Sequence, residues 1–376
     1  MKKKILLVGV GAEIGSLLLS IKNKNKSFDI DTAITRPIFK DKQKNFDSII
    51  ARIILSNPSE IDKIGHNLKK NEIFINNKKI KIFFKDIEKD NIKLNKFFFA
   101  SILATSKKHI NDQSILKKLK SISKFVFGVA ENVNLPAFYP SLNNAKSKII
   151  NDKFKKIKDQ KIFALGSCQT NGWLSQLNAL TYSLDRLIRK YEFLNFEVDI
   201  IHPDTPTGKL GTKSFEPRAQ ESRNNFRPSF SQVQLSINRI FPKVRSINTV
   251  SLRTLIDPPG YMISRFFFET KNQNLNRLKL DSLKSNLHKF SNQFPNILKV
   301  TDLPLGSKAF SFSKEGSVLL SSEKYLHLKQ NLFSSVDRNI HEIIFQSYVH
   351  NTRGYCHSVL NSLDFFIKNK NKKIII

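Results

Sequence analysis

The first twenty residues carry a pattern that few folds accommodate: a short apolar run, a group of glycines and a second apolar run. Ile5-Leu-Leu-Val8 predicts a buried strand, and Ser16-Leu-Leu-Leu-Ser-Ile21 predicts the helix that follows it. Gly9, Gly11 and Gly15 stand between them. Glycines in such a turn let the backbone approach a pyrophosphate, which the helix N-terminus then stabilises. The spacing is one residue longer than the usual dinucleotide-binding fingerprint, so a tight turn without a ligand is the alternative interpretation.

The end of the second predicted strand bears on the choice of cofactor. Residues 28–34 alternate like a strand, and Arg36 follows them about twenty residues after the glycines. An acidic residue at this point would bind the ribose 2′-hydroxyl of NAD, whereas an arginine accommodates the 2′-phosphate of NADP. Arg36 therefore favours NADP over NAD, with an ordinary surface arginine as the alternative.

The rest of the N-terminal half alternates between strands and helices. Residues 70–84 predict a hairpin with Asn76-Asn77 in its turn, residues 97–103 a buried strand and residues 112–121 a helix. This alternation predicts an α/β fold with a parallel sheet. The lysine-rich residues 146–161 predict a solvated helix or linker at a domain boundary.

A cysteine stands where a long helix is expected to begin. Cys168 lies in Gly166-Ser-Cys-Gln-Thr-Asn171, and apolar residues from Trp173 to Ile188 recur at three- and four-residue steps. A thiol at a helix N-terminus meets free backbone N–H groups and the positive end of the helix dipole, which favour the thiolate. A small buried hydrophobe is the alternative interpretation of one cysteine. The chain has 2 cysteines, so a reducing compartment is expected and no disulfide framework.

The second half of the sequence predicts a domain with a mainly antiparallel sheet. Residues 196–201 alternate like a strand that ends at His202, and residues 203–228 form a long loop rich in Pro, Thr, Gly and Arg. Loops of that length in compact domains are usually functional or disordered. Residues 248–252 and 261–268 predict further strands of a mainly antiparallel sheet.

The composition limits the classes of partner. The formal net charge is +32 at 40% hydrophobic residues, and lysine is spread along the chain with much Asn, Ile and Phe. We interpret this charge as a solvated surface that attracts anionic metabolites, so nucleic acid is not the expected partner. Glu13 and the glycines interrupt the N-terminal apolar stretch, and no apolar run approaches the roughly 20 residues of a membrane span. A cytoplasmic protein without a membrane partner is expected.

Several of these segments occur in one order that resembles the glyceraldehyde-3-phosphate dehydrogenase family, and the resemblance covers nearly the whole chain. The nucleophile motif of that family reads Ser-Cys-Thr-Thr-Asn, and residues 167–171 resemble it. The other matching segments are residues 5–15, 136–146, 199–205, 225–242, 250–254 and 351–356.

The resemblance implies a role for each matching residue. Cys168 would be the nucleophile that adds to an aldehyde, and His202 would lower its pKa and act as the base. The hydride would pass to a nicotinamide cofactor oriented by Asn351, and phosphate or water would then attack the thioester. Positions for the substrate phosphate and the attacking phosphate are matched by Ser167, Thr205, Ser231, Arg253 and an arginine of the long loop, either Arg218 or, preferred, Arg223. No metal is implied.

Three departures place the substrate in question. Gln169 replaces a threonine that contacts the attacking phosphate, Thr207 replaces an aspartate, and the Ser-Thr-Gly on the adenine side is absent around residues 99–103. The main hypothesis is a phosphorylating, NADP-preferring oxidoreductase for a phosphorylated aldehyde. The alternatives are the same chemistry on another sugar phosphate, such as erythrose 4-phosphate, and a non-catalytic nucleotide- or RNA-binding paralogue.

The expected architecture has three parts. Residues 1–166 would form a Rossmann-type dinucleotide-binding domain and residues 167–337 an α+β catalytic domain. Residues 338–376 would be a C-terminal helical segment that returns to the first domain, with a helix over 358–367. The resemblance implies a homotetramer.

Overall fold

The structure is a computed structural model of a mixed α/β chain. It describes residues 2–11, 13–21, 26–56, 63–132, 134–135, 160–203, 227–231, 233–241, 244, 246–254, 256–271, 275–334 and 338–369. Contacts divide the chain into two compact units. The first comprises Met1–Pro140, Asp152–Gly166 and Val359–Ile376, and the second comprises Ser141–Asn151 and Ser167–Ser358.

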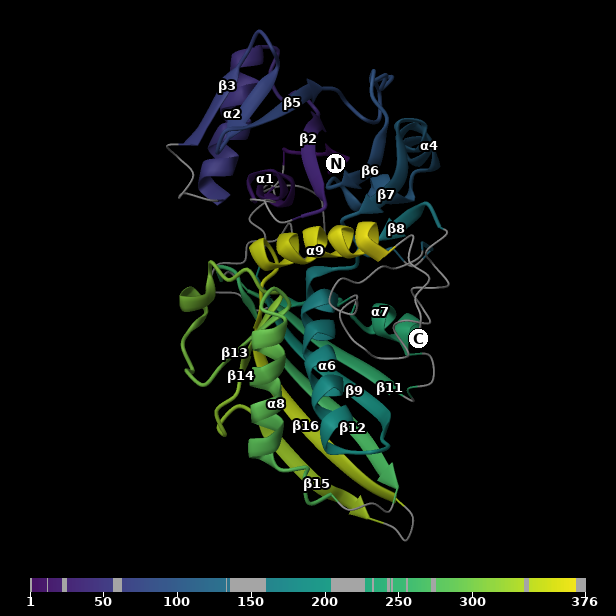
Figure 1. The fold of residues 1–376 in the computed structure, drawn as a ribbon, viewed down its shortest axis with the longest axis vertical. Coiled ribbons are helices and arrows are strands. Elements are labelled where there is room, and N and C mark those ends of the chain that lie inside the picture. The colour runs from purple at the N-terminus through teal and green to yellow at the C-terminus, as the bar shows by residue number, and fades with distance from the viewer. Residues whose placement is uncertain are drawn as a thin grey trace. The chain divides into compact units, whose positions relative to one another are not determined.

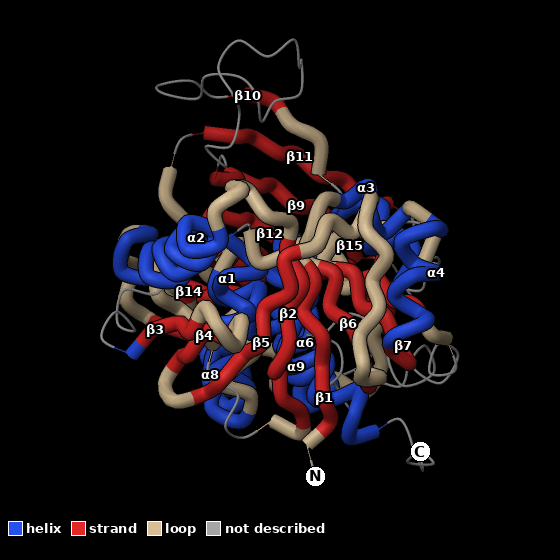
Figure 2. Tube along the Cα trace, turned by 90° about the horizontal axis from the view of Figure 1, so that it is seen from above, coloured by secondary structure: helices blue, strands red, loops and turns tan. Residues whose placement is uncertain are grey.

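The first unit contains a mixed sheet with the strand order β3-β4-β5-β2-β1-β6-β7-β8. All neighbours from β5 to β8 are parallel, whereas β3 and β4 extend the β5 edge as antiparallel strands. Figure 2 shows β5, β2, β1, β6 and β7 side by side in this order. The strands are β1 (Lys3–Val8), β2 (Phe28–Thr35), β3 (Ile64–Asn67), β4 (Glu72–Ile75), β5 (Lys78–Phe84), β6 (Phe98–Leu103), β7 (Ser123–Gly128) and β8 (Ile162–Ala164).

Local sequence explains most of this unit. Asn76 and Asn77 form the β4–β5 turn with φ angles of 50° and 65°, which asparagine tolerates better than most residues. Asp112 caps α4 (Gln113–Ile122) by accepting from the backbone N–H groups of Ser114 and Ile115. The expected hairpin, buried strand and helix are therefore confirmed. The other helices here are α1 (Glu13–Ser20), α2 (Lys42–Ser56) and α3 (Lys107–Asn111).

The second unit contains a sheet with the order β10-β11-β9-β12-β16-β14-β13, and β15 also pairs with β16. Among its described strands, β9–β11 and β13–β14 are parallel pairs and the other pairs are antiparallel. The strands are β9 (Glu192–Pro203), β10 (Arg227–Pro228), β11 (Ser246–Thr254), β12 (Gly260–Lys271), β13 (Leu298–Thr301), β14 (Ser317–Leu320), β15 (His327–Ser334) and β16 (Arg338–Val349).

Two long helices, α6 (Cys168–Leu187) and α8 (Leu280–Gln293), pack side by side against this sheet (Figure 1). Trp173 of α6 is fully buried, with its ring 5.1 Å from that of Phe196 and 5.6 Å from that of Phe266. These aromatic contacts hold the first turns of α6 on β9 and β12. The remaining helices are α7 (Val233–Ile240), the 3-10 helix η4 (Ser307–Phe310) and α9 (Arg353–Asn369).

The C-terminal segment differs from the expectation over part of its length. Residues 338–349 form the strand β16 and not a helix, because their alternating buried side chains pair with β12 and β14 in the second unit. The helical part begins at Arg353 as α9, and its residues from Val359 onward belong to the first unit. The predicted linker over 146–159 and the loop over 204–226 lie outside the described residues.

Candidate active site

Cys168 is the first residue of α6, as the sequence predicts. Ser167 caps the helix by accepting from the Thr170 backbone N–H at 3.2 Å, and the Asn171 side chain donates to the Ser167 carbonyl at 2.9 Å. Gly166 precedes them with a φ of 72°, a conformation that glycine adopts without steric cost. The thiol is partly buried at the positive end of a 20-residue helix, where a thiolate is stabilised.

The structure brings His202 close to this cysteine. It lies near the end of β9, with its Nε2 atom 3.9 Å from the Cys168 Sγ atom. The two residues are 34 positions apart in the chain. A thiol and an imidazole at this distance can exchange a proton, and this geometry is the basis of nucleophilic cysteine catalysis.

The first turns of two helices meet beside the cysteine. Thr170, in the first turn of α6, donates through Oγ1 to the Ser236 hydroxyl of α7 at 3.3 Å. Ser231 lies just before α7, and its hydroxyl accepts from the Val233 backbone N–H at 3.2 Å. The first turns of α6 and α7 are therefore in contact, and each helix carries the positive end of its dipole at this end.

Arg253 lies beside His202 in the structure. It is 7% exposed and is the register partner of His202 on the parallel strand β11. Its Nη1 atom lies 3.1 Å from the His202 Nδ1 atom and 3.4 Å from the Pro203 carbonyl oxygen. Arg253 therefore contacts the imidazole and the backbone next to it. Thr205, Arg218 and Arg223 lie outside the described residues.

The sequence marks Gln169 only as a departure from the family motif, and the structure adds that its side chain is buried. It is 4% exposed, and neither atom of its amide has a hydrogen-bond partner in the part of the chain that the structure describes. It shares a helix face with Gly172, which packs on Val349 at the end of β16. Asn351, two residues after Val349, is also buried, and its Oδ1 atom has no hydrogen-bond partner among the described residues.

The glycine turn of the first unit has the backbone that the sequence predicts. Gly9 has a φ of 95°, and its N–H donates to the Ile34 carbonyl at 2.8 Å. A Cβ atom on Gly15 would lie 1.9 Å from the Gly9 carbonyl oxygen, so α1 packs directly on the turn. A Cβ atom on Gly11 would meet the Thr35 Oγ1 atom at 3.7 Å and no nearer atom. Arg36 is exposed after the end of β2.

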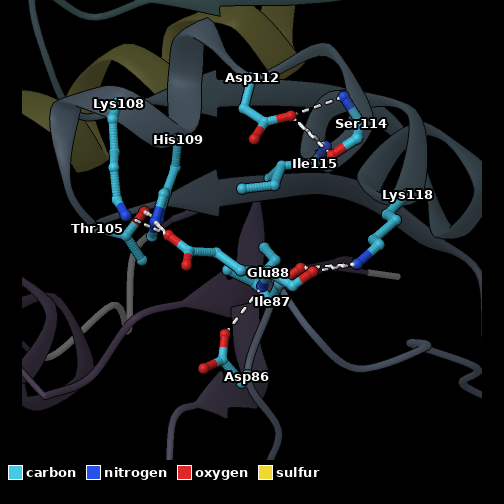
Figure 3. Close-up of polar contacts among 10 residues, drawn as sticks. All are labelled: Asp86, Ile87, Glu88, Thr105, Lys108, His109, Asp112, Ser114, Ile115 and Lys118. Carbon is cyan, nitrogen blue, oxygen red and sulfur yellow. Dashed lines mark hydrogen bonds and ion pairs between the residues drawn. The ribbon is translucent and has the colours of Figure 1, made fainter.

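A polar cluster beside this turn was not predicted (Figure 3). A Cβ atom on Gly9 would lie 2.4 Å from the Thr105 Cγ2 atom, and the Thr105 hydroxyl lies 2.9 Å from the His109 Nδ1 atom. His109 Nε2 in turn lies 2.7 Å from Glu88, which Lys108 also contacts. The hydrogen bonds from Lys108 and His109 lower the pKa of the Glu88 carboxyl. No local pattern joins these residues, since Glu88 lies 21 positions before His109.

The described residues contain no group of three or more His, Cys, Asp or Glu side chains that could hold a metal ion. No helix in the described ranges is long and apolar enough to cross a membrane. Comparison of the chain with models of protein families gives no match, and comparison with curated proteins also gives no match.

Proposed function

We propose that this chain is an NAD(P)-dependent oxidoreductase of the glyceraldehyde-3-phosphate dehydrogenase type, which oxidises a phosphorylated aldehyde. The observation that carries the proposal is the placement of Cys168 at the N-terminus of α6 with its Sγ atom 3.9 Å from His202 Nε2. The thiolate is favoured by the helix, and the imidazole is within reach of the same reacting atoms.

The first unit supports a dinucleotide as the cofactor. Its parallel strands β5-β2-β1-β6-β7-β8 follow the 3-2-1-4-5-6 order of the Rossmann-type fold. Gly11 in the glycine turn after β1 is exposed, and we assign this turn to the pyrophosphate of the cofactor. The exposed Arg36 at the end of β2 is our candidate for the 2′-phosphate of NADP. The orphaned Oδ1 of Asn351 fits its proposed contact with the nicotinamide.

The protein's own residues account for the proposed chemistry. The Cys168 thiol gives its proton to His202 Nε2, and its sulfur forms a bond to the aldehyde carbon as the C=O π bond opens. The same proton then passes to the carbonyl oxygen, which gives a thiohemiacetal and leaves His202 unprotonated. His202 then removes the hydroxyl proton through Nε2, so that the electron pair re-forms the C=O bond as a hydride ion leaves. A bound nicotinamide ring supplies the acceptor for that hydride. Phosphate, or water, finally attacks the thioester carbon, releases the acyl product and restores the thiolate.

The anionic groups of the substrates have partners on the same unit. The paired first turns of α6 and α7 provide positive dipole ends, and we assign Ser167 and Ser231 to the attacking phosphate. We assign Thr205, Arg223 and Arg253 to the phosphate of the aldehyde. The homotetramer and the cytoplasmic location remain part of this proposal.

The test is the initial rate of reduced-cofactor formation with glyceraldehyde 3-phosphate and with erythrose 4-phosphate. Each is measured with NADP and with NAD, in the presence and absence of inorganic phosphate. Cys168→Ala should abolish the rate, whereas Cys356→Ala should retain it, because Cys356 is the second cysteine and is buried in α9. Arg36→Ala should raise the KM for NADP more than that for NAD. Arg52→Ala, an exposed arginine of α2, is the charge-matched control.

The outcomes separate the hypotheses. A phosphate-stimulated rate that depends on Cys168 supports the main proposal, and turnover restricted to erythrose 4-phosphate supports the alternative substrate. Absence of turnover with either cofactor, together with salt-sensitive RNA binding and an unreactive Cys168, would contradict the enzymatic proposal and favour a binding paralogue.

A further inference from the structure

Gln169 lies on the face of α6 that packs on the sheet of the second unit. Further along this face, Gln176 donates through Nε2 to the Ser347 hydroxyl of β16 at 2.6 Å. One turn nearer the start of α6, Gly172 packs on Val349, the last residue of β16. Helix residues three or four positions apart share a face, so Gln169 belongs to the same row. Each step toward the start of α6 therefore matches a step along β16 toward its end.

The next step in this register brings Gln169 to Asn351. Three residues of a helix rise about 4.5 Å and two residues of extended chain about 6.6 Å, so the two rows advance together. Side chains of a helix also tilt toward its N-terminus, which directs the Gln169 amide past the first turn of α6. Both residues belong to the second unit, so this unit alone brings the two amides together.

The turn that carries Asn351 is held by contacts on both sides. The Nε2 atom of His350 lies 2.6 Å from the Ser311 carbonyl oxygen. The Thr352 carbonyl accepts from the Cys356 backbone N–H at 2.9 Å, in the first turn of α9. The backbone that positions the Asn351 amide is therefore fixed before any ligand binds.

The polar atoms of these two side chains define the ligand that they fit. Gln169 is 4% exposed and Asn351 is 9% exposed. Oε1 and Nε2 of Gln169 and Oδ1 of Asn351 have no hydrogen-bond partner among the described residues. This set consists of two acceptors and one donor, and it carries no charge. A primary carboxamide is its complement, because the NH2 group has two donors and the oxygen accepts. A carboxylate or a phosphate would place further oxygens against the two amide oxygens.

We propose that Gln169, together with Asn351, binds the carboxamide of the nicotinamide ring. The NH2 group donates to Gln169 Oε1 and Asn351 Oδ1, and the carboxamide oxygen accepts from Gln169 Nε2. These contacts fix the rotation of the ring, so Gln169 is a cofactor-binding residue and not a ligand of the attacking phosphate. The inference rests on the proposed function, which supplies the nicotinamide cofactor, and goes beyond it in the role of Gln169.

The experiment is isothermal titration calorimetry with four ligands, and it needs no turnover. They are NADP, its nicotinic acid analogue, its 3-acetylpyridine analogue and 2′-phospho-ADP-ribose, which lacks the ring. The first analogue has a carboxylate in place of the carboxamide, and the second has a methyl group in place of the NH2 group. We expect NADP to bind at least about tenfold more tightly than either analogue, because each leaves buried amide oxygens without a donor.

Variants of Gln169 assign the preference to this side chain. Gln169→Leu should weaken the binding of NADP about tenfold and leave that of 2′-phospho-ADP-ribose unchanged. Gln169→Glu should reject the nicotinic acid analogue more strongly than the unmodified protein does, because two carboxylates would meet. Gln176→Leu is the matched control, since it removes the same amide from the same helix face two turns further on. It should keep the preference for NADP.

Two results would overturn the inference. Equal affinity of the unmodified protein for NADP and both analogues would show that an ordered water is a sufficient partner for the Gln169 amide. Unchanged ligand binding in a folded Gln169→Leu protein with a lower free energy of unfolding would show that the amide serves the fold. If Gln169→Leu does not fold, as judged by circular dichroism, Gln169→Met and Gln169→Glu decide the question.

Free nicotinamide, followed by saturation-transfer NMR, separates the inference from the proposed function. A chain that binds nicotinamide through Gln169 but binds no dinucleotide would contradict the proposed function and leave the carboxamide site intact. A chain that oxidises an aldehyde with NADP but shows no preference for the carboxamide would contradict the inference alone. A chain that binds neither nicotinamide nor a dinucleotide would contradict both.

Discussion

Replacement of Gly15 by alanine tests whether α1 packs as closely on the glycine turn as the structure indicates. An alanine in place of glycine inside a helix ordinarily stabilises it by up to about 1 kcal/mol. At position 15 the opposite sign is expected, because the new Cβ atom would lie 1.9 Å from the Gly9 carbonyl oxygen and 2.9 Å from its carbonyl carbon. These are backbone atoms, which cannot rotate away.

The magnitude follows from the movement that is needed. Contacts of real Cβ atoms essentially never fall below 3.0 Å, so α1 must shift by about 1 Å relative to the turn. Overpacking of this kind costs about 1 to 3 kcal/mol, which exceeds the gain in helix propensity. We expect Gly15→Ala to lower the free energy of unfolding of the first unit by roughly 1 to 2 kcal/mol.

Urea denaturation followed by two probes locates the effect. Far-ultraviolet circular dichroism reports on both units, whereas fluorescence of Trp173, the chain's single tryptophan, reports on the second unit. The loss should appear in circular dichroism and leave the fluorescence transition in place. Gly65→Ala is the control in the same unit, because a Cβ atom there meets no atom of the described residues within 4 Å. A Gly15→Ala protein as stable as the unmodified chain would refute the close packing.

Three further predictions follow from buried side chains. Gln169→Leu should raise the free energy of unfolding by about 1 kcal/mol, since it removes a buried amide that has no hydrogen-bond partner among the described residues. It should also lower kcat/KM if that amide contacts substrate. Phe366→Ala should cost about 3 to 5 kcal/mol in the first unit, because its ring packs on three phenylalanine rings at 5.1 to 5.2 Å; a loss below 1 kcal/mol would contradict the docking of α9. Burial lowers the pKa of His341 below its ordinary 6.5, so the unfolded chain takes up a proton that the native chain does not, and stability should fall as pH drops below 6.5. His341→Gln should remove up to about 1.4 kcal/mol per pH unit of that slope, at a constant cost from the lost bond to Thr270.

The variant Gln169→Leu tests whether stability and the proposed function are opposed in one residue. A buried amide without partners destabilises the folded chain, and native proteins contain few such groups. Gln169 directly follows Cys168, where our proposed function has the substrate bind. A gain in stability together with a loss of activity in Gln169→Leu would therefore indicate a residue retained for binding.

The sequence by itself determined the features that depend on neighbouring residues. The glycine turn, the Asn76-Asn77 hairpin, the helix that begins at Cys168 and the strand that carries His202 all follow from backbone sterics, capping and the period of apolar residues. These effects act over a few neighbouring positions, so they can be predicted from the sequence alone.

Only the tertiary structure decided the contacts that depend on strand register and burial. Arg253 meets His202 across 51 positions because β11 and β9 pair in one register, and a shift by one residue would turn the guanidinium to the other face of the sheet. The cluster of Thr105, His109 and Glu88 likewise joins a loop to a helix. The same long-range packing turned residues 338–349 into a central strand, because their alternating apolar side chains are buried against β12 and α6, partners that no local pattern specifies.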